Sequence, residues 1–538
     1  MALGGSIAAP PAGMERRWRL KRPSSLQGWA LLAALLTLIP LGGIALAALS
    51  GPGADIPLRD IFRYGWTSAL LALIVGILTA ATGSVAAWLV VMHRFPGRSF
   101  FSWALALPLA APAFALAYAY ADLLGPAGDL RIWMRGELGF DLPFEIRSIG
   151  GAGFVLSCAF YPYVYLAMRA AFLGQSVSAL EAARVLGCSQ REAFFRAALP
   201  LARPALAAGV ALAVMETLAD YGAVQFLAVQ TLTTGVVRAW SVFGTTAGAA
   251  QLALPLLGAA ALLLWIERAA RSGRSHDSAR IQPRPLPVVD LGGAKAALAT
   301  LACTLLLTIA LLLPFAWLIV NALNHAPDVP RLVDAAVHSL SMGITGAVVT
   351  TALALVLALG AARSPLAVRI ASLGYATPGA AIAIGLLLPA AAIWQIAPTA
   401  SGYWVGIGLL VYAYAARLMA AALEPIDAGL ARVTPSMIGA SRTLGRTEAG
   451  AALAVQVPVA RGALLTAALI VFIDVLKELP ATLILRPFNF DTLAVIANNY
   501  ALDERLGQAG WPSAMIVLLA LPPTIWLSRK IAGSRPGS

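Results

Sequence analysis

The sequence predicts an all-α integral membrane protein of about 12 transmembrane helices, arranged as two parallel repeats of six helices each. Three observations support this prediction. The mean hydropathy is +0.81. Hydrophobic residues make up 60% of the chain and charged residues only 12%, which is typical of integral membrane proteins. A polar loop in the first half returns in the second half, followed each time by a similar apolar segment.

Apolar stretches close to the ~20 residues needed to cross a bilayer follow one another along the chain. We expect spans at about 28–50, 66–92, 99–120, 150–172, 204–219, 247–266, 294–320, 338–361, 366–394, 402–421, 462–476 and 510–528. The first apolar run is longer than the 7–15 residues of a secretory signal core, so we expect a retained span. A basic stretch rich in Ser and Pro separates the halves and indicates a linker. The predicted organisation is an N-terminal tail (1–27), a first domain (28–266), a linker (267–293), a second domain (294–528) and a C-terminal tail (529–538).

Basic residues predict the orientation. They cluster in the N-terminal tail, in both copies of the repeated loop, in the linker and at the C-terminus, so the positive-inside rule places both termini and both loops in the cytoplasm. The net charge of +13 is then a topology signal. No basic patch interleaved with aromatic residues indicates nucleic-acid binding. The three cysteines are widely spaced and form neither a disulfide framework nor a metal-ligand pattern.

The repeated loop runs from Glu181 to Pro200 and again from Gly439 to Pro458. Its Gly, Leu-Gly pair and Pro fall at matching positions in both copies. Ser and Thr residues at capping positions predict two short helices, and Gly187 and Gly445 suit the left-handed residue that ends the first of them. We expect the second helix to stop near the Pro, and its apolar side chains to face a partner groove in the cytosol.

This loop resembles the "EAA" loop of ABC importer permeases, through Glu181, Ala182, Ala183, Gly187 and Pro200 in the first copy. The second copy keeps Gly445 and Pro458 but has Gly439 where the first has Glu181. The resemblance implies a type I ABC importer permease fold in a bacterial inner membrane. It also implies two cytoplasmic ABC ATPase subunits, docked on the two loops, and a periplasmic substrate-binding protein.

Two acids four residues apart end the fifth predicted span of each half. They are Glu216 and Asp220 in the first half and Asp474 and Glu478 in the second. Residues at i and i+4 share one helical face, and ionisable groups at membrane depth are functional candidates. We predict that these acids line a cation path. A structural alternative is that they cap helix ends or pair with Arg238, Lys477 or Arg486.

The stretches Asp220 to Trp240 and Lys477 to Ala494 resemble the ferric-iron branch of the permease family, which implies iron as the transported solute. A permease for thiamine, a polyamine or another small solute is the alternative, followed by an ion-gradient-driven secondary transporter. No phosphate-loop motif occurs, so ATP hydrolysis is expected in a separate subunit and the chain itself is not expected to be an enzyme. We expect no cofactor and no permanently bound metal.

Overall fold

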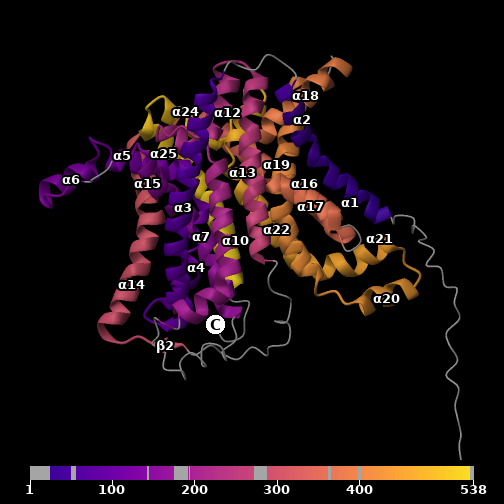
Figure 1. Cartoon of the computed structure of the whole chain (residues 1–538), viewed down its shortest axis with the longest axis horizontal. Coiled ribbons are helices and arrows are strands. Elements are labelled where there is room, and N and C mark those ends of the chain that lie inside the picture. The colour runs from indigo at the N-terminus through magenta and orange to yellow at the C-terminus, as the bar shows by residue number, and fades with distance from the viewer. Residues whose placement is uncertain are drawn as a thin grey trace, which may run out of the picture.

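The computed structural model describes residues 25–49, 56–141, 145–174, 192, 194–271, 288–361, 365–397 and 401–532. Within these ranges the regular structure is helical except for one pair of two-residue strands, which confirms the predicted all-α class. Ten of the described helices are long and apolar enough to cross a membrane, and a bent pair of helices makes a possible eleventh span. In Figure 1 the helices of the first half, indigo to magenta, lie beside those of the second half, salmon to yellow.

The first half begins with α1 (Ser25–Leu36) and α2 (Leu38–Leu49), which together make one span. The elements that follow are α3 (Leu58–Met92), β1 (His93–Arg94), α4 (Arg98–Ala104), the 3-10 helix η1 (Leu107–Ala110), α5 (Ala113–Leu124), α6 (Asp129–Glu137), α7 (Ile149–Gly174), the π-helix η2 (Phe194–Ala198), α10 (Leu199–Ala219), α11 (Gly222–Phe226), α12 (Leu232–Ser241) and α13 (Thr246–Arg271).

The second half is preceded by β2 (Val289–Asp290) and begins with α14 (Gly293–Leu307). Its other elements are the π-helix η4 (Thr308–Leu312), α15 (Leu313–Asn324), α16 (Val329–Ala361), α17 (Pro365–Ala376), α18 (Gly379–Ile396), α19 (Gly402–Leu430), α20 (Pro435–Thr443), α21 (Glu448–Ala451), the π-helix η5 (Ala452–Gln456), α22 (Val457–Leu476), α23 (Pro480–Leu485), α24 (Leu493–Leu502) and α25 (Leu506–Ala532).

Two of the expected spans are broken rather than continuous. The stretch expected as a span at 99–120 bends by 90° between Ala110 and Ala113, and the one at 366–394 divides into α17 and α18. Each break has a proline immediately before the next helix, Pro112 before α5 and Pro378 before α18, with ψ of 141° and 144°. Proline lacks the N–H that would continue a helix and restricts the residue before it. The two breaks bring helix starts into the interior of the protein.

The first span of each half packs against the other half. Helix α2 lies along α18, and α15 contacts α5 as well as α25. The α2–α18 contact is backbone to backbone, because a Cβ added at Gly43 would lie 1.9 Å from the Gly385 carbonyl oxygen. Conversely, a Cβ added at Gly385 would lie 2.0 Å from the Pro40 carbonyl oxygen. Glycine allows this approach because it has no side chain, as at many helix crossings in membranes.

The repeat seen in the sequence is also a repeat of backbone geometry. The π-helices η2 and η5 occupy corresponding positions, and each runs directly into a span whose second residue is the repeated proline, Pro200 or Pro458. The prediction that the short helix stops near this proline is therefore wrong. Proline is tolerated in the first turn of a helix, and the wider π turn absorbs the missing hydrogen bond.

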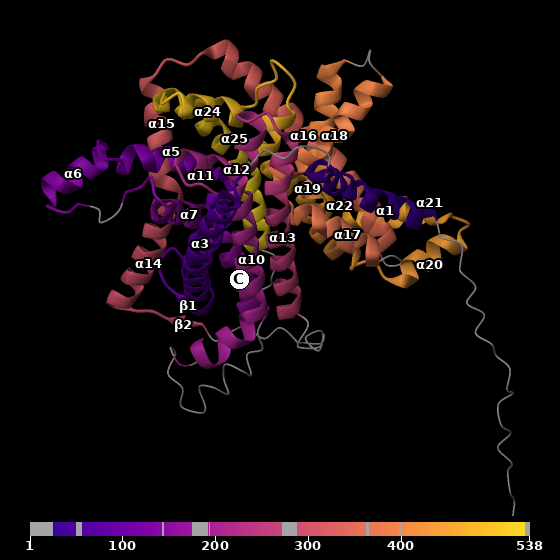
Figure 2. The same ribbon diagram turned by 45° about the horizontal axis from the view of Figure 1, so that its top comes forward.

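The end of the linker is fixed to the first half. Strands β1 and β2 pair in parallel, with His93 opposite Val289 and Arg94 opposite Asp290. The Leu291 N–H donates to the Arg94 carbonyl at 3.0 Å. Figure 2 shows this pair at the same end of the molecule as the start of α14.

Candidate functional site

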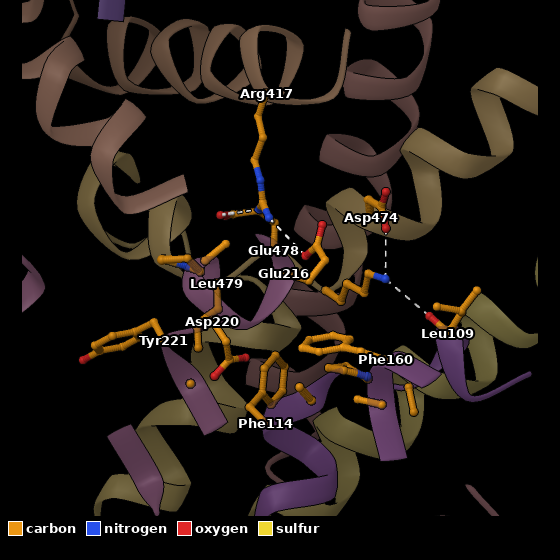
Figure 3. A pocket seen from close by; sticks show the side chains of 18 of the residues that line it. Leu109, Phe114, Phe160, Glu216, Asp220, Tyr221, Arg417, Asp474, Glu478 and Leu479 are labelled. Atoms are coloured by element: carbon orange, nitrogen blue, oxygen red, sulfur yellow. Dashed lines mark hydrogen bonds and ion pairs between the residues drawn. The ribbon is translucent and has the colours of Figure 1, made fainter. Parts of the chain in front are cut away.

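A cavity lies where α10 and α22 end, between the two halves, and its empty space of about 700 Å³ includes open solvent. The same segment of each repeat lines the cavity, 216–222 in the first half and 474–480 in the second, although only some residues of each segment reach it. The start of α5 and side chains from α7 and α19 complete the wall. All four acids predicted from the sequence therefore face one shared cavity, as Figure 3 shows.

The second acid of each pair caps a short helix. The Asp220 carboxylate accepts hydrogen bonds from the backbone N–H groups three and four residues ahead, both at 3.1 Å, at the start of α11. Glu478 does the same at the start of α23, at 3.0 and 3.1 Å, and also accepts the Thr482 hydroxyl at 2.8 Å. A carboxylate at a helix N-terminus accepts hydrogen bonds from free N–H groups and interacts favourably with the positive end of the helix dipole. The structural alternative of helix caps therefore describes these two acids.

The first acid of each pair has a cationic partner instead. Lys477 lies 2.9 Å from the Asp474 carboxylate and also donates to the Leu109 carbonyl of the first half at 3.3 Å. Glu216 is paired with Arg417 of α19 at 3.4 Å. Of the three cations expected as possible partners, Lys477 is found there, whereas Arg238 lies over the Phe243 ring and Arg486 pairs with Asp491.

Arg417 is the residue that sequence reasoning missed. Its guanidinium lies between Glu216 of the first half and Glu478 of the second, 3.5 Å from the latter. Figure 3 shows the side chain reaching from α19 into the cavity between these two acids. An arginine within a long apolar helix is itself a sign of function. That sign was available in the sequence, but its partners were not, because they lie far away along the chain.

The charge of the cavity wall is negative. Four carboxyl groups face two cationic side chains, Arg417 and Lys477, which leaves a formal excess of two negative charges. Among the described residues, no three His, Cys, Asp or Glu side chains are grouped closely enough to hold a metal ion.

The second copy of the repeated loop has the predicted helix, glycine, helix geometry. Helix α20 ends before Gly445, which has φ of +80°. Thr447 then caps α21 by accepting the Gly450 N–H at 3.1 Å. Gly439 lies exposed on α20, with open space where a side chain would start. In the first copy, Glu181, Ala182, Ala183 and Gly187 lie outside the described residues.

Apolar side chains are exposed along this loop. Leu444 is 82% exposed and Leu453, on η5, is 69% exposed. Phe195, which holds the position of Leu453 in the first copy, is 55% exposed. Its neighbour Phe194 instead packs on Trp88. The same position thus presents an exposed apolar side chain in both halves.

Comparison with known proteins finds a family match. Residues 72–274 match the model of the binding-protein-dependent transport system inner membrane component. The Fe(3+)-transport system permease protein FbpB 2 of Haemophilus influenzae is 25% identical over 471 residues, which cover 86% of this chain and 88% of that protein.

Two other relatives match a shorter part of this chain. The molybdenum transport system permease protein ModB of Escherichia coli is 29% identical over 220 residues, 38% of this chain and 95% of that protein. The sulfate transport system permease protein CysT of Escherichia coli is 27% identical over 202 residues, 37% of this chain and 72% of that protein. A relative that fits almost whole within 38% of the chain agrees with a double-length organisation.

Proposed function

This chain belongs to the family of binding-protein-dependent transport system inner membrane components, and we propose that the solute it carries across the membrane is ferric iron. The chain is the multi-pass inner-membrane permease subunit of an ABC importer, a transport subunit without catalytic activity of its own. Such a transporter works with a substrate-binding protein and an ATPase.

The proposal for iron is carried by the excess of carboxyl groups in the cavity. Carboxylate oxygens are hard ligands and suit hard cations, and a negatively charged wall attracts a trivalent cation while it repels an anion. The relative named for Fe(3+) transport also matches across both halves of this chain, whereas the relatives named for molybdenum and sulfate match a much shorter part.

The proposed mechanism uses both ends of the molecule. A loaded binding protein docks on the periplasmic face, and two ATPase copies close on nucleotide in the cytoplasm, where both chain termini lie. Each ATPase engages one repeated loop through its apolar position, Phe195 or Leu453. In this proposal the loop residues Glu181, Ala182, Ala183, Gly187, Pro200, Gly439, Gly445 and Pro458 form the two coupling elements. Movement of the loops passes directly into α10 and α22, because η2 and η5 continue into these spans.

Ferric iron then passes the acids at the far ends of α10 and α22. In this proposal Glu216 and Asp474 contact the ion, one from each half. Asp220 and Glu478 contribute negative charge from fixed positions, because their oxygens already hold backbone N–H groups.

An oxyanion is the second candidate solute. Arg417 and Lys477 place two positive charges in the same cavity, and two of the relatives are named for molybdenum and sulfate transport. Cationic side chains are the usual ligands of such anions. The excess of carboxyl groups favours iron over this alternative.

Uptake by cells that carry or lack this chain tests the proposal. Labelled ferric iron, sulfate, molybdate and thiamine are offered separately, with the partner ATPase either intact or inactivated. Iron uptake that needs both the chain and ATP is the expected result. Uptake of another solute alone would overturn the iron assignment, and uptake independent of ATP would favour a gradient-driven transporter.

A paired variant tests the path itself. Replacing Glu216 with Gln and Asp474 with Asn removes one cavity charge from each half, and we expect iron uptake to be lost while the ATPase still co-purifies. The matched control is Asp129→Asn with Glu137→Gln, two exposed acids of α6 outside the cavity. Normal iron uptake in the cavity variant would contradict the path.

A further inference from the structure

The cations of the cavity come from one half only. Arg417 and Lys477 both belong to the second half, and the first half has Ala219 at the position corresponding to Lys477. Both cations also reach the first half, Arg417 at Glu216 and Lys477 at the Leu109 carbonyl. Both cations of the cavity wall therefore come from the second half, and Arg417 neutralises an acid of the first half across the boundary.

The two acids held by Arg417 differ in how firmly they are fixed. The Glu478 side chain is 1% exposed and accepts two backbone N–H groups and one hydroxyl. A Cβ added at Gly379 would lie 2.4 Å from its Oε1 atom, so this carboxylate has little room to move. Glu216 is 23% exposed and, among the residues that the structure describes, its hydrogen-bond and ion-pair partner is Arg417.

Arg417, whose side chain is 14% exposed, is itself held loosely. One guanidinium nitrogen faces one oxygen of Glu216 at 3.4 Å, and the other faces one oxygen of Glu478 at 3.5 Å. The strong arrangement, in which both nitrogens meet the two oxygens of a single carboxylate at 2.7–2.9 Å, is not formed with either acid. The side chain is long and unbranched, so it can leave Glu216 while it remains beside Glu478.

We propose that Arg417 is the resident counter-ion of this cavity, which a transported hard cation displaces from Glu216. Before transport the guanidinium neutralises Glu216 and joins the two halves through it. An arriving trivalent cation takes the place of the guanidinium beside Glu216 and contacts Asp474 as well, and Arg417 turns toward Glu478. The ion thus breaks a contact between the halves as it enters. This inference rests on the proposed transport of iron and adds a residue that determines charge selectivity.

Terbium provides a direct probe, because Tb3+ is a hard trivalent cation whose luminescence is excited by nearby aromatic side chains. Tyr163 and Tyr221 line the cavity. We would titrate Tb3+ into the purified complex of permease and ATPase, without nucleotide, for the wild type, Arg417→Gln and Arg417→Lys. Removing one positive charge at a distance of a few ångströms strengthens trivalent-ion binding by about tenfold or more, even at the dielectric constant of water.

We expect Arg417→Gln to bind Tb3+ most tightly. The wild type and Arg417→Lys should bind Tb3+ more weakly, with affinities similar to each other. The gain must disappear in Arg417→Gln/Glu216→Gln, which separates the cavity from other acids on the protein. A merely structural arginine would not give this pattern, because Arg417→Lys would then share the defect of Arg417→Gln. Unchanged or weaker Tb3+ binding by Arg417→Gln would overturn the proposal.

Two further readouts keep the result decisive. If Arg417→Gln does not assemble, Glu216→Gln breaks the same contact from the other side and must bind Tb3+ more weakly than wild type; equal binding overturns the proposal. Iron uptake by the wild type is measured in parallel. A clear terbium effect without iron uptake would overturn the proposed function alone, and iron uptake without a terbium effect would overturn the exchange alone.

Discussion

Replacing Gly43 with alanine is expected to separate two helices that meet backbone to backbone. The added Cβ would lie 1.9 Å from the carbonyl oxygen of Gly385. A close carbon–oxygen contact between helices in proteins is about 3.4 Å, so α2 and α18 must move apart by roughly 1.5 Å. A Cβ added at Gly385 would likewise lie 2.0 Å from the Pro40 carbonyl oxygen, so the two backbones approach each other closely at both glycines.

The magnitude follows from two opposing effects. Overpacking of this kind destabilises a protein by about 1–3 kcal/mol, and alanine in place of glycine inside a helix returns up to about 1 kcal/mol. Gly42 provides the matched control, because a Cβ there meets nothing within 4 Å. We therefore expect Gly43→Ala to lower the free energy of unfolding by roughly 1–2 kcal/mol, and Gly42→Ala to leave it equal or slightly higher.

Thermal unfolding in detergent, followed with a thiol-reactive dye, measures this difference. Cys158 and Cys303 are buried and become reactive only as the helices separate. We expect the unfolding midpoint of Gly43→Ala to fall by a few degrees relative to both wild type and Gly42→Ala. Equal midpoints for the two alanine variants would refute the close contact between α2 and α18.

Three further predictions follow from single contacts. Gly445→Val places a β-branched residue at φ of +80°, a conformation that costs such residues about 1–3 kcal/mol. We expect less ATPase to co-purify with this variant, whereas Gly439→Ala should not change the amount. Equal recovery of the ATPase with both variants would contradict the coupling role of the loop. Glu478→Ala leaves Arg417 and two buried N–H groups without their carboxylate, so it should lower the free energy of unfolding by about 3–5 kcal/mol. Asp220→Ala should lower it by only about 1 kcal/mol. Thermal unfolding measures both losses, and a smaller loss for Glu478→Ala than for Asp220→Ala would be inconsistent with the burial of Glu478. Arg131 is 5% exposed and pairs with two carboxylates at 2.8 and 3.1 Å. Arg131→Ala should make the segment after α6 sensitive to added protease. Unchanged cleavage would argue against a structural role for these ion pairs.

Features that depend on local sequence were predictable. Hydropathy located ten of the twelve expected spans as continuous helices among the described residues. Capping residues together with Gly445 predicted the bent shape of the second loop. The convergence of Glu216 and Asp474 followed from the repeat, because corresponding positions of two similar halves meet where the halves meet.

Features that depend on distant residues were not predictable. Arg417 is separated by hundreds of residues from Glu216, and no local pattern marks the two as partners. The contact between α2 and α18 also joins residues that lie far apart in the sequence, so no local pattern predicts it. The breaks at Pro112 and Pro378 lie between these cases: each proline was visible in the sequence, but membrane helices also accommodate proline without breaking, so its effect depends on the surroundings.

The contact between α2 and α18 also bears on biosynthesis. Gly43 enters the membrane before Gly385, which is made several hundred residues later. At bacterial rates of about 5–20 residues per second, the interval is on the order of half a minute. During that time the glycine face of α2 has only lipid beside it. A soluble helix with such a face would risk aggregation, whereas lipid tails are as apolar as the missing partner. The bilayer thus keeps the exposed glycine face of α2 in an apolar environment until α18 is made and packs against it.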